Sequence, residues 1–228
     1  MTDNAMKPTI PVFLSLNAGY VDTAGFLALQ GLFTAHVTGN FVTFGASLVL
    51  GTSGAVAKLL ALPVFCAVVV GVGLLGLRFS AGQFPIFRAL LAIKVFLLAL
   101  AASLAIWLGP FKTGDGWPAI ATGMTLVSAM AIQNSVQRVH LSNSPPTTLM
   151  TGTTTQIMLD VAHLLHGAMP EAKSVIRARL TRMSANVISF ALGCAAGALG
   201  FALFGDWCFL APPILALPTF FLAMPKSS

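Results

Sequence analysis

Apolar residues in this chain gather into long runs that short polar stretches separate. Six of the runs, at residues 10–30, 59–77, 89–108, 118–137, 183–204 and 208–222, are long enough to form membrane-crossing helices. A helix needs roughly 20 apolar residues to cross a hydrocarbon core of about 30 Å. Only helices and closed barrels satisfy their backbone in lipid, and the sequence lacks the alternating strands of about ten residues that build a barrel. The pattern therefore predicts an all-α polytopic membrane protein with six firm transmembrane helices.

Two shorter segments, 37–50 and 147–165, are apolar but do not resemble lipid-facing spans. The first is short, and the second carries Gln156, Asp160 and His163. Partial or re-entrant helices are tolerated at membrane depth only where protein or a water-filled cavity surrounds them. We expect two short polar helices of this kind, each beginning near a Thr-Gly pair. Two short packed spans are the alternative, and they would raise the count to eight.

The basic residues favour six spans over eight. With six spans and a cytoplasmic N-terminus, nine basic residues fall in inside loops and two, Lys58 and Lys112, fall outside. The inside set is Lys7, Arg78, Arg88, Arg138, Lys173, Arg177, Arg179, Arg182 and Lys226. Eight spans would weaken this asymmetry to eight against three, whereas cytoplasmic loops carry an excess of Lys and Arg. Either count places both termini in the cytoplasm. The six-span layout also brings Trp107, Trp117 and Trp207 to one membrane interface.

Composition supports a membrane protein and excludes other classes. Of the 228 residues, 57% are hydrophobic and 8% are charged, whereas a soluble domain averages about 25% charged. Such a chain has too few polar groups to cover a water-facing surface, so most of its exterior must face a lipid bilayer. The net charge of +6 lacks the basic stripe of a nucleic-acid-binding protein. Asn17 and Asp22 interrupt the first run, so we expect it to remain as a span and not to act as a cleaved signal peptide.

The most informative feature is a polar motif that occurs twice. In each half an apolar helix carries polar residues, and a Thr-Gly pair follows before another helix. The first copy is Ala18-Gly19-Tyr20-Val21-Asp22-Thr23 with Thr38-Gly39-Asn40, and the second is Met130-Ala131-Ile132-Gln133-Asn134-Ser135 with Thr151-Gly152-Thr153. Asp22 and Asn134 are 112 residues apart, and Thr38 and Thr151 are 113 apart. A period near half the chain length predicts one membrane domain, 1–228, with related halves at 10–110 and 117–223.

Asp22 is the strongest single candidate for a functional residue. An ionised carboxylate near the centre of a span costs at least about 2.5 kcal/mol, so it faces the bundle interior or an aqueous cavity. Arg138 and Lys94 are the cations that could pair with it. Two roles stay open for Asp22, with Tyr20 beside it in the motif. It is either a proton or cation site, or a hydrogen-bonded acid that locks the two halves together.

The amides of the second copy suit either solute binding or packing. Gln133 and Asn134 lie at the counterpart of Asp22, and a pseudo-two-fold axis would bring Asp22 and Asn134 towards a shared centre. Amide contacts between helices are the alternative, worth about 0.6 kcal/mol each on average.

Both Thr-Gly pairs precede an apolar helix, where threonine can cap the helix and glycine allows the turn. At membrane depth such helix N-termini would attract an anion or a substrate carboxylate, whereas at the interface they would be simple caps. The residues concerned are Thr38, Gly39, Asn40, Thr151 and Gly152.

Gln156, Asp160 and His163 form one polar stripe, which we expect to line a cavity or to contact the other half. Together with His166 the stripe could ligate a metal, but the sequence offers no further ligand set, and we expect no metal and no cofactor. No Walker phosphate loop or Gly-x-Ser-x-Gly elbow occurs. We therefore expect no enzymatic activity.

These motifs resemble those of the YoaK family, a domain-of-unknown-function family of bacterial inner-membrane proteins. The resemblance rests on Ala-Gly-x-x-Asp at 18–22 followed by Thr38-Gly39-Asn40, and on Gln133-Asn134 and Thr151-Gly152 in the second half. It spans about residues 12–222. Where such proteins often have Gly-x-Gln-Asn, this chain has Ala131-Ile132-Gln133-Asn134, which weakens an argument for close helix approach there. The resemblance implies a polytopic inner-membrane protein, commonly labelled a predicted permease, and supplies no substrate.

Three spans in each half would make the halves inverted, which is the architecture of many secondary transporters with a midplane site. We therefore expect a permease for an unknown small solute, passive or proton-coupled. Asp22 would be the proton or cation site, and Asn134 and Gln133 would orient the solute. The alternatives are a non-transporting membrane scaffold or accessory protein and, less favoured, a membrane enzyme. A bundle of this size could also complete its pathway only as a homodimer.

Overall fold

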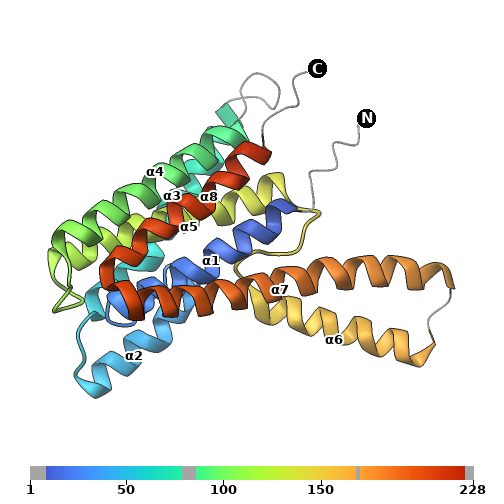
Figure 1. The fold of residues 1–228 in the computed structure, drawn as a ribbon, viewed down its shortest axis with the longest axis horizontal. Helices are drawn as coiled ribbons and strands as arrows, with labels where there is room; N and C mark the ends of the chain where they lie inside the picture. Colours follow the sequence, from blue (N-terminus) through green and yellow to red (C-terminus); the bar gives the residue numbers. More distant parts are fainter. Residues whose placement is uncertain (1–8, 79–85, 168–169, 224–228) are drawn as a thin grey trace.

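A computed structural model describes residues 9–78, 86–167 and 170–223, and Figure 1 shows its fold. The helices are α1 (Thr9–Ala28), α2 (Asn40–Leu50), α3 (Ala55–Arg78), α4 (Ile86–Leu108), α5 (Trp117–His140), α6 (Met150–His166), α7 (Pro170–Phe204) and α8 (Ala211–Leu222). Short 3-10 turns, η1 (Val37–Gly39) and η2 (Gly205–Leu210), precede α2 and α8. The described residues contain no strand, so the expected all-α class is confirmed.

Several of these helices are long and apolar enough to cross a membrane. They are α3, α4, α5 and the continuous stretch Ala172–Leu222, which comprises α7, η2 and α8. α1 is outside this set because polar residues, among them Asn17 and Asp22, lower its hydropathy. Large apolar side chains stay exposed on α3, up to 83% of the side chain at Leu77, as contact with lipid requires. The chain is therefore a multi-pass membrane protein.

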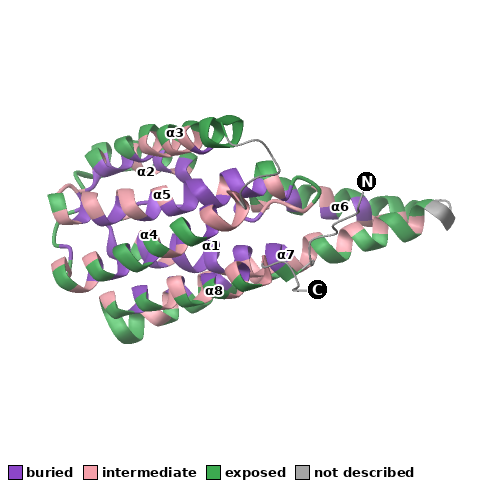
Figure 2. Cartoon of the chain, turned by 90° about the horizontal axis from the view of Figure 1, so that it is seen from above, coloured by how far each residue is buried: buried purple, intermediate pink, exposed green. Residues whose placement is uncertain are grey.

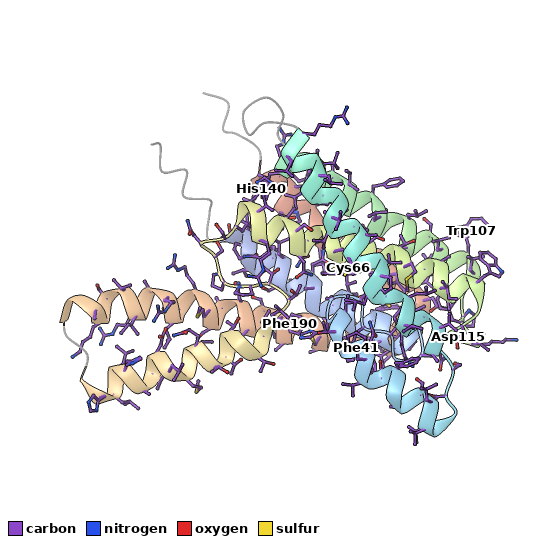
Figure 3. All side chains as sticks on the ribbon, turned by 180° about the vertical axis from the view of Figure 1, so that it is seen from behind. Phe41, Cys66, Trp107, Asp115, His140 and Phe190 are labelled. Carbon is purple, nitrogen blue, oxygen red and sulfur yellow. The ribbon has the colours of Figure 1, made fainter. Side chains whose placement is uncertain are left out.

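The bundle has two distinct ends, and its long helices alternate between them. Helices α1, α4 and α7 run towards the end that holds Trp107, Trp117 and Trp207, here called the tryptophan end. Helices α3, α5 and α8 run the opposite way, towards the His140 end (Figure 3). A separate apolar cluster fills each end of the bundle. The first and last described residues, Thr9 and Ala223, therefore lie at the same end (Figure 1).

The first helix of each sequence half packs against the other half. α1 lies against α7 and α8, while α5 lies against α3 and α4. The approach of α1 to α7 is close enough to exclude side chains. A Cβ atom on Gly19 would overlap the carbonyl oxygen of Phe190, and one on Gly193 would overlap the carbonyl oxygen of Leu16. Glycine is therefore required at these positions for the two backbones to touch.

Helix α6 and the first part of α7 form a hairpin that extends beyond the His140 end and is mostly exposed or half-buried (Figure 2). Asp160 is its buried centre. Its carboxylate accepts hydrogen bonds from Arg179 Nη2 (2.6 Å), Arg179 Nε (2.8 Å) and Gln156 Nε2 (2.9 Å). The Arg179 bonds hold the pKa of Asp160 below its usual value. The polar stripe therefore closes a hairpin within its own half and does not meet the other half as expected.

Candidate functional site

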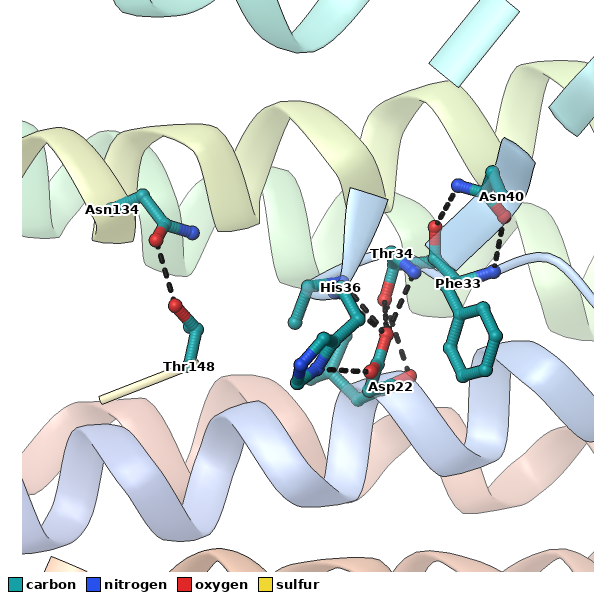
Figure 4. A network of polar contacts seen from close by, with 9 residues as sticks. Asp22, Phe33, Thr34, His36, Asn40, Asn134 and Thr148 are labelled. Atoms are coloured by element: carbon teal, nitrogen blue, oxygen red, sulfur yellow. Dashed lines mark hydrogen bonds and ion pairs between the residues drawn. The ribbon is translucent and has the colours of Figure 1, made fainter. Parts of the chain in front are cut away.

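The chain between α1 and α2 turns back into the bundle. Gln30 lies just beyond α1 and donates to the carbonyl oxygen of Phe111, in the loop at the tryptophan end (3.3 Å). Residues 34–36 then return to the level of Asp22, well inside the bundle. The Oδ1 atom of Asp22 accepts the backbone N–H groups of residue 34 (2.8 Å), residue 35 (2.7 Å) and residue 36 (3.4 Å), as Figure 4 shows.

Helix α2 then leads back to the tryptophan end. Beyond it, the N–H groups of Gly54, Val56 and Ala57 donate to the carboxylate of Asp115, which lies in the loop between α4 and α5. The segment from residue 31 to residue 50 is therefore re-entrant: it enters from one end and leaves by the same end. This geometry is that of the expected partial helix, and the number of spans stays a prediction.

Buried polar side chains make this irregular backbone tolerable. Non-helical backbone at membrane depth needs hydrogen-bond partners, because lipid offers none. Asp22 is 4% exposed and supplies the acceptor for the loop N–H groups. Asn40 supplies a second anchor, since its side chain donates to the carbonyl oxygen of Phe33 (2.7 Å) and accepts its N–H (2.9 Å). The basic side chain that contacts Asp22 is His36, with Nδ1 at 3.6 Å from Oδ2, in place of the expected Arg138 or Lys94.

Asn134 of α5 likewise anchors a loop that follows it in the chain. Asn134 Oδ1 accepts the hydroxyl of Thr148 (2.7 Å), which lies 14 residues further along the chain. Asp22 and His36 are separated by the same 14 residues. The neighbouring Gln133 donates to Thr147 Oγ1 (3.1 Å), so the loop before α6 also returns to the level of these amides. Asp22 and Asn134 thus each hold a loop of their own half.

The two Thr-Gly helices begin where expected but are capped differently. Gly39 is the N-cap of α2, and Leu149 is the N-cap of α6, and neither N-cap has a side-chain hydrogen bond. Thr151 and Gly152 therefore lie inside the first turn of α6. The expectation that threonine caps these helices is wrong, because the chain enters each helix one or more residues away from the hydroxyl.

A cavity of about 390 Å³ lies between α3 and α5, next to the re-entrant loop. Its polar lining comes from both halves: His36 and Thr38 from the loop and η1, and Asn134, Ser135 and Arg138 from α5. Its apolar lining comes mainly from α3 and includes Leu62, Phe65, Val69 and Val72. Leu149, the N-cap of α6, lies at its edge. A smaller cavity of about 180 Å³ shares Asn134, Arg138 and Leu149 and continues along Ser142 and Ser144 at the His140 end.

His36 is the residue of this site that the sequence did not reveal. Its ring stands edge-on to Phe33 on one side and to Phe190 of α7 on the other, at centroid distances of 6.4 Å and 6.1 Å. Nδ1 faces Asp22, so the rest of the ring is left to face the cavity. The available signal was its position two residues before Thr38 in a segment expected at membrane depth.

The structure brings some candidate residues to this cavity and leaves others elsewhere. Thr38, Asn134 and Arg138 line it, and Asp22 lies directly behind His36. The other candidates lie elsewhere. Tyr20 donates a hydrogen bond to the carbonyl oxygen of Cys208, and Gln133 accepts one from Lys94 and donates one to the carbonyl oxygen of Leu14. Gly39 and Asn40 lie at the start of α2, Thr151 and Gly152 are exposed on α6, and Gln156 and Asp160 belong to the hairpin. Among the described residues, no three His, Cys, Asp or Glu side chains gather as a metal site would need.

Long apolar helices, exposed apolar faces and polar loops buried at depth define a multi-pass helical membrane protein. Within that class, the chain belongs to the DUF1275 family, described as proteins of unknown function, whose model matches residues 10–222. It is also similar to the UPF0700 transmembrane protein YoaK of Bacillus subtilis (strain 168). The two are 27% identical over 167 residues, which cover 71% of this chain and 70% of that protein. The resemblance to the YoaK family is thereby confirmed. No solved structure matches the chain.

Proposed function

We propose that this protein is a permease for a small solute, with six spans arranged as two inverted halves and no catalytic role. The order of elements supports the halves, because α5, α6, α7 and α8 follow one another as α1, α2, α3 and α4 do. The pairs α1 and α5, α3 and α7, and α4 and α8 run in opposite directions (Figure 1). Their contacts are also exchanged, since α1 meets α7 and α8 where α5 meets α3 and α4. Many secondary transporters are built from such inverted repeats.

We assign the His140 end to the cytoplasm of a bacterial inner membrane. Arg78, Arg88, Arg138 and the basic residues of the α6–α7 hairpin lie at or beyond that end, whereas Lys58 and Lys112 lie at the tryptophan end. This distribution follows the positive-inside rule. Lys7 and Lys226, the other basic residues expected on the cytoplasmic side, lie outside the described residues. Exposure of 85% at Trp107, 69% at Trp117 and 62% at Trp207 suits an interfacial aromatic belt.

The observation that carries the proposal is the cavity between the halves. It is bounded by the re-entrant loop of the first half and by the helix start of the second. Its volume of about 390 Å³ is in the range of small-molecule sites, roughly 300–1,000 Å³. A site between two inverted halves can open to either side when one half rocks against the other.

Thiol accessibility tests this proposal without knowledge of the solute. In a chain with Cys66, Cys194 and Cys208 replaced by alanine, single cysteines are placed at Thr38 in the cavity, Thr52 at the tryptophan end and Ser142 at the His140 end. Each is labelled from either side of the membrane with an impermeant thiol reagent. A carrier exposes Thr38→Cys to both sides in turn, while the two end positions react from opposite single sides. Labelling of Thr38→Cys from one side only would refute alternating access.

A non-transporting scaffold remains the second candidate, and one observation favours it. The Asp22 carboxylate is engaged by backbone N–H groups, and Gln133 has hydrogen-bond partners on α1, α4 and the loop before α6. Side chains engaged in this many hydrogen bonds stabilise the packing of the helices whether or not the protein transports a solute. A homodimer likewise stays a prediction, which the mass of the purified protein in detergent would test.

A further inference from the structure

We propose that the cavity binds a small organic carboxylate, that is, an anion with a compact apolar body. The inference deepens the permease function and rests on it for movement of the solute, although not for binding. It is carried by the charge of the cavity lining and by the division of that lining into a polar and an apolar wall.

The cavity offers positive charge without a matching acid. Arg138 lines both cavities and makes no hydrogen bond or ion pair within the described part of the chain. Of the Asp and Glu side chains that the structure describes, none lines either cavity. Arg138 is exposed and lies in the last turn of α5, so its guanidinium reaches the cavity from the His140 end. This positive charge is therefore available to an anionic group of a solute in the cavity.

The other acids are committed elsewhere. Asp115 holds the start of α3, and Asp160 is paired with Arg179 in the hairpin. Asp206 lies in η2, at the tryptophan end. Asp22 lies behind His36, and its Oδ1 accepts the backbone N–H groups of the loop. Among the described residues, therefore, the chain brings no free carboxylate to Arg138.

The opposite wall selects for an apolar body. Leu62, Phe65, Val69 and Val72 of α3 face the cavity, and they offer no hydrogen bond to a strongly hydrated ion. An inorganic anion would lose hydration there without compensation. A carboxylate with a small hydrocarbon body satisfies both walls, with its charged end at Arg138 and Asn134 and its body on α3. Arginine suits the charged end, because its guanidinium binds carboxylates in a bidentate manner.

Binding of radiolabelled benzoate to the purified protein in detergent tests the inference. Competitors are isobutyrate, benzamide, which matches benzoate in shape but has no charge, and benzylamine, which carries the opposite charge. The variants are R138Q, R138K, which keeps the charge, and R177Q as a matched control on the exposed hairpin. A hydrogen bond to a charged group typically accounts for about tenfold or more in affinity.

We expect saturable benzoate binding that isobutyrate displaces and that equal concentrations of benzamide and benzylamine do not. R138Q should weaken it about tenfold or more, R138K less, and R177Q less than about twofold. Displacement by benzamide as effective as by isobutyrate, unaltered binding by R138Q, or no saturable binding would each overturn the inference. Displacement by phosphatidylglycerol but not by isobutyrate would also overturn it, in favour of a lipid.

Flux measurements in proteoliposomes separate this inference from the permease proposal. Arg138-dependent benzoate binding without benzoate flux would leave the site in place and remove the transport function. Flux of benzamide that R138Q does not change would keep the transport function and overturn the carboxylate preference.

Discussion

Substitution of Gly193 by alanine should separate the two helices that hold the halves together. A Cβ atom added to Gly193 would overlap the carbonyl oxygen of Leu16 on α1. Ordinary van der Waals contact begins at 3.4 Å, so α1 and α7 must move apart by about 1.3 Å. A gap of about 0.5–1 Å already forfeits a quarter to a half of each dispersion contact along the interface. We expect G193A to lower the free energy of unfolding by about 2–3 kcal/mol.

Gly71 of α3 provides the matched control. It is also a glycine in the interior of an apolar helix, but a Cβ there meets nothing within 4 Å. Alanine has the higher helix propensity, by up to about 1 kcal/mol in aqueous hosts, so G71A should leave stability unchanged or raise it. The assay is unfolding of the detergent-solubilised protein by increasing mole fractions of sodium dodecyl sulfate, followed by circular dichroism.

The reciprocal position gives a second check. Gly19 faces the carbonyl oxygen of Phe190 across the same interface, so G19A should cost a similar amount. The double variant should lose less than the sum of the two, because the first substitution already separates the helices. Wild-type stability of G193A, or equal effects of G193A and G71A, would refute the close approach of α1 and α7.

Three further outcomes follow from the contacts described. D22A removes the acceptor of two short backbone hydrogen bonds and should lower the free energy of unfolding by about 2–5 kcal/mol. D22N keeps an oxygen at that position and should lower it much less. Equal unfolding curves for the two variants would contradict the anchoring role. D115A removes the acceptor at the start of α3 and should cost about 1–2 kcal/mol in the same assay, with wild-type stability as the contrary result. The pKa of Asp160 is lowered in the folded protein, so its stabilisation of the hairpin is present above about pH 4 and is lost as the pH falls through that lowered pKa. Proteolysis at α6 should therefore rise at this acidic pH in the wild type, and R179Q should already be cleaved at neutral pH.

The sequence predicted the helices well because the length of an apolar run is a local property. The run at 89–108 became α4, Ile86–Leu108, and the run at 118–137 became α5, Trp117–His140. It predicted the start of α7 poorly, at residue 183 in place of Pro170. The polar first part of that helix is paired with α6 through Arg179, and a long-range pairing leaves no hydropathy signal.

The candidate site was predicted only in part, for the same reason. Asp22 and Asn134 can be predicted because a polar residue that interrupts an apolar run is recognisable from the sequence alone. His36 was not, since its role depends on a loop that turns back to the level of Asp22. The spacing of Gln156, Asp160 and His163 predicts a polar face on α6, but it does not show that this face contacts Arg179 of α7, because spacing defines a helix face and not its neighbour.

Asp22 and Asn134 differ in type because the loops that they anchor offer different hydrogen-bond donors. The first loop presents backbone N–H groups, and a carboxylate is the stronger acceptor for several donors at one oxygen. The second presents the hydroxyl of Thr148, for which a neutral amide oxygen is sufficient. The first half therefore carries a negative charge at depth, and it places His36 against that charge on the cavity side. The carboxylate that fixes the loop thus also contacts His36, the side chain of that loop that lines the cavity. A variant that keeps the loop but removes the charge, D22N, should for this reason alter which solutes the cavity accepts without unfolding the protein.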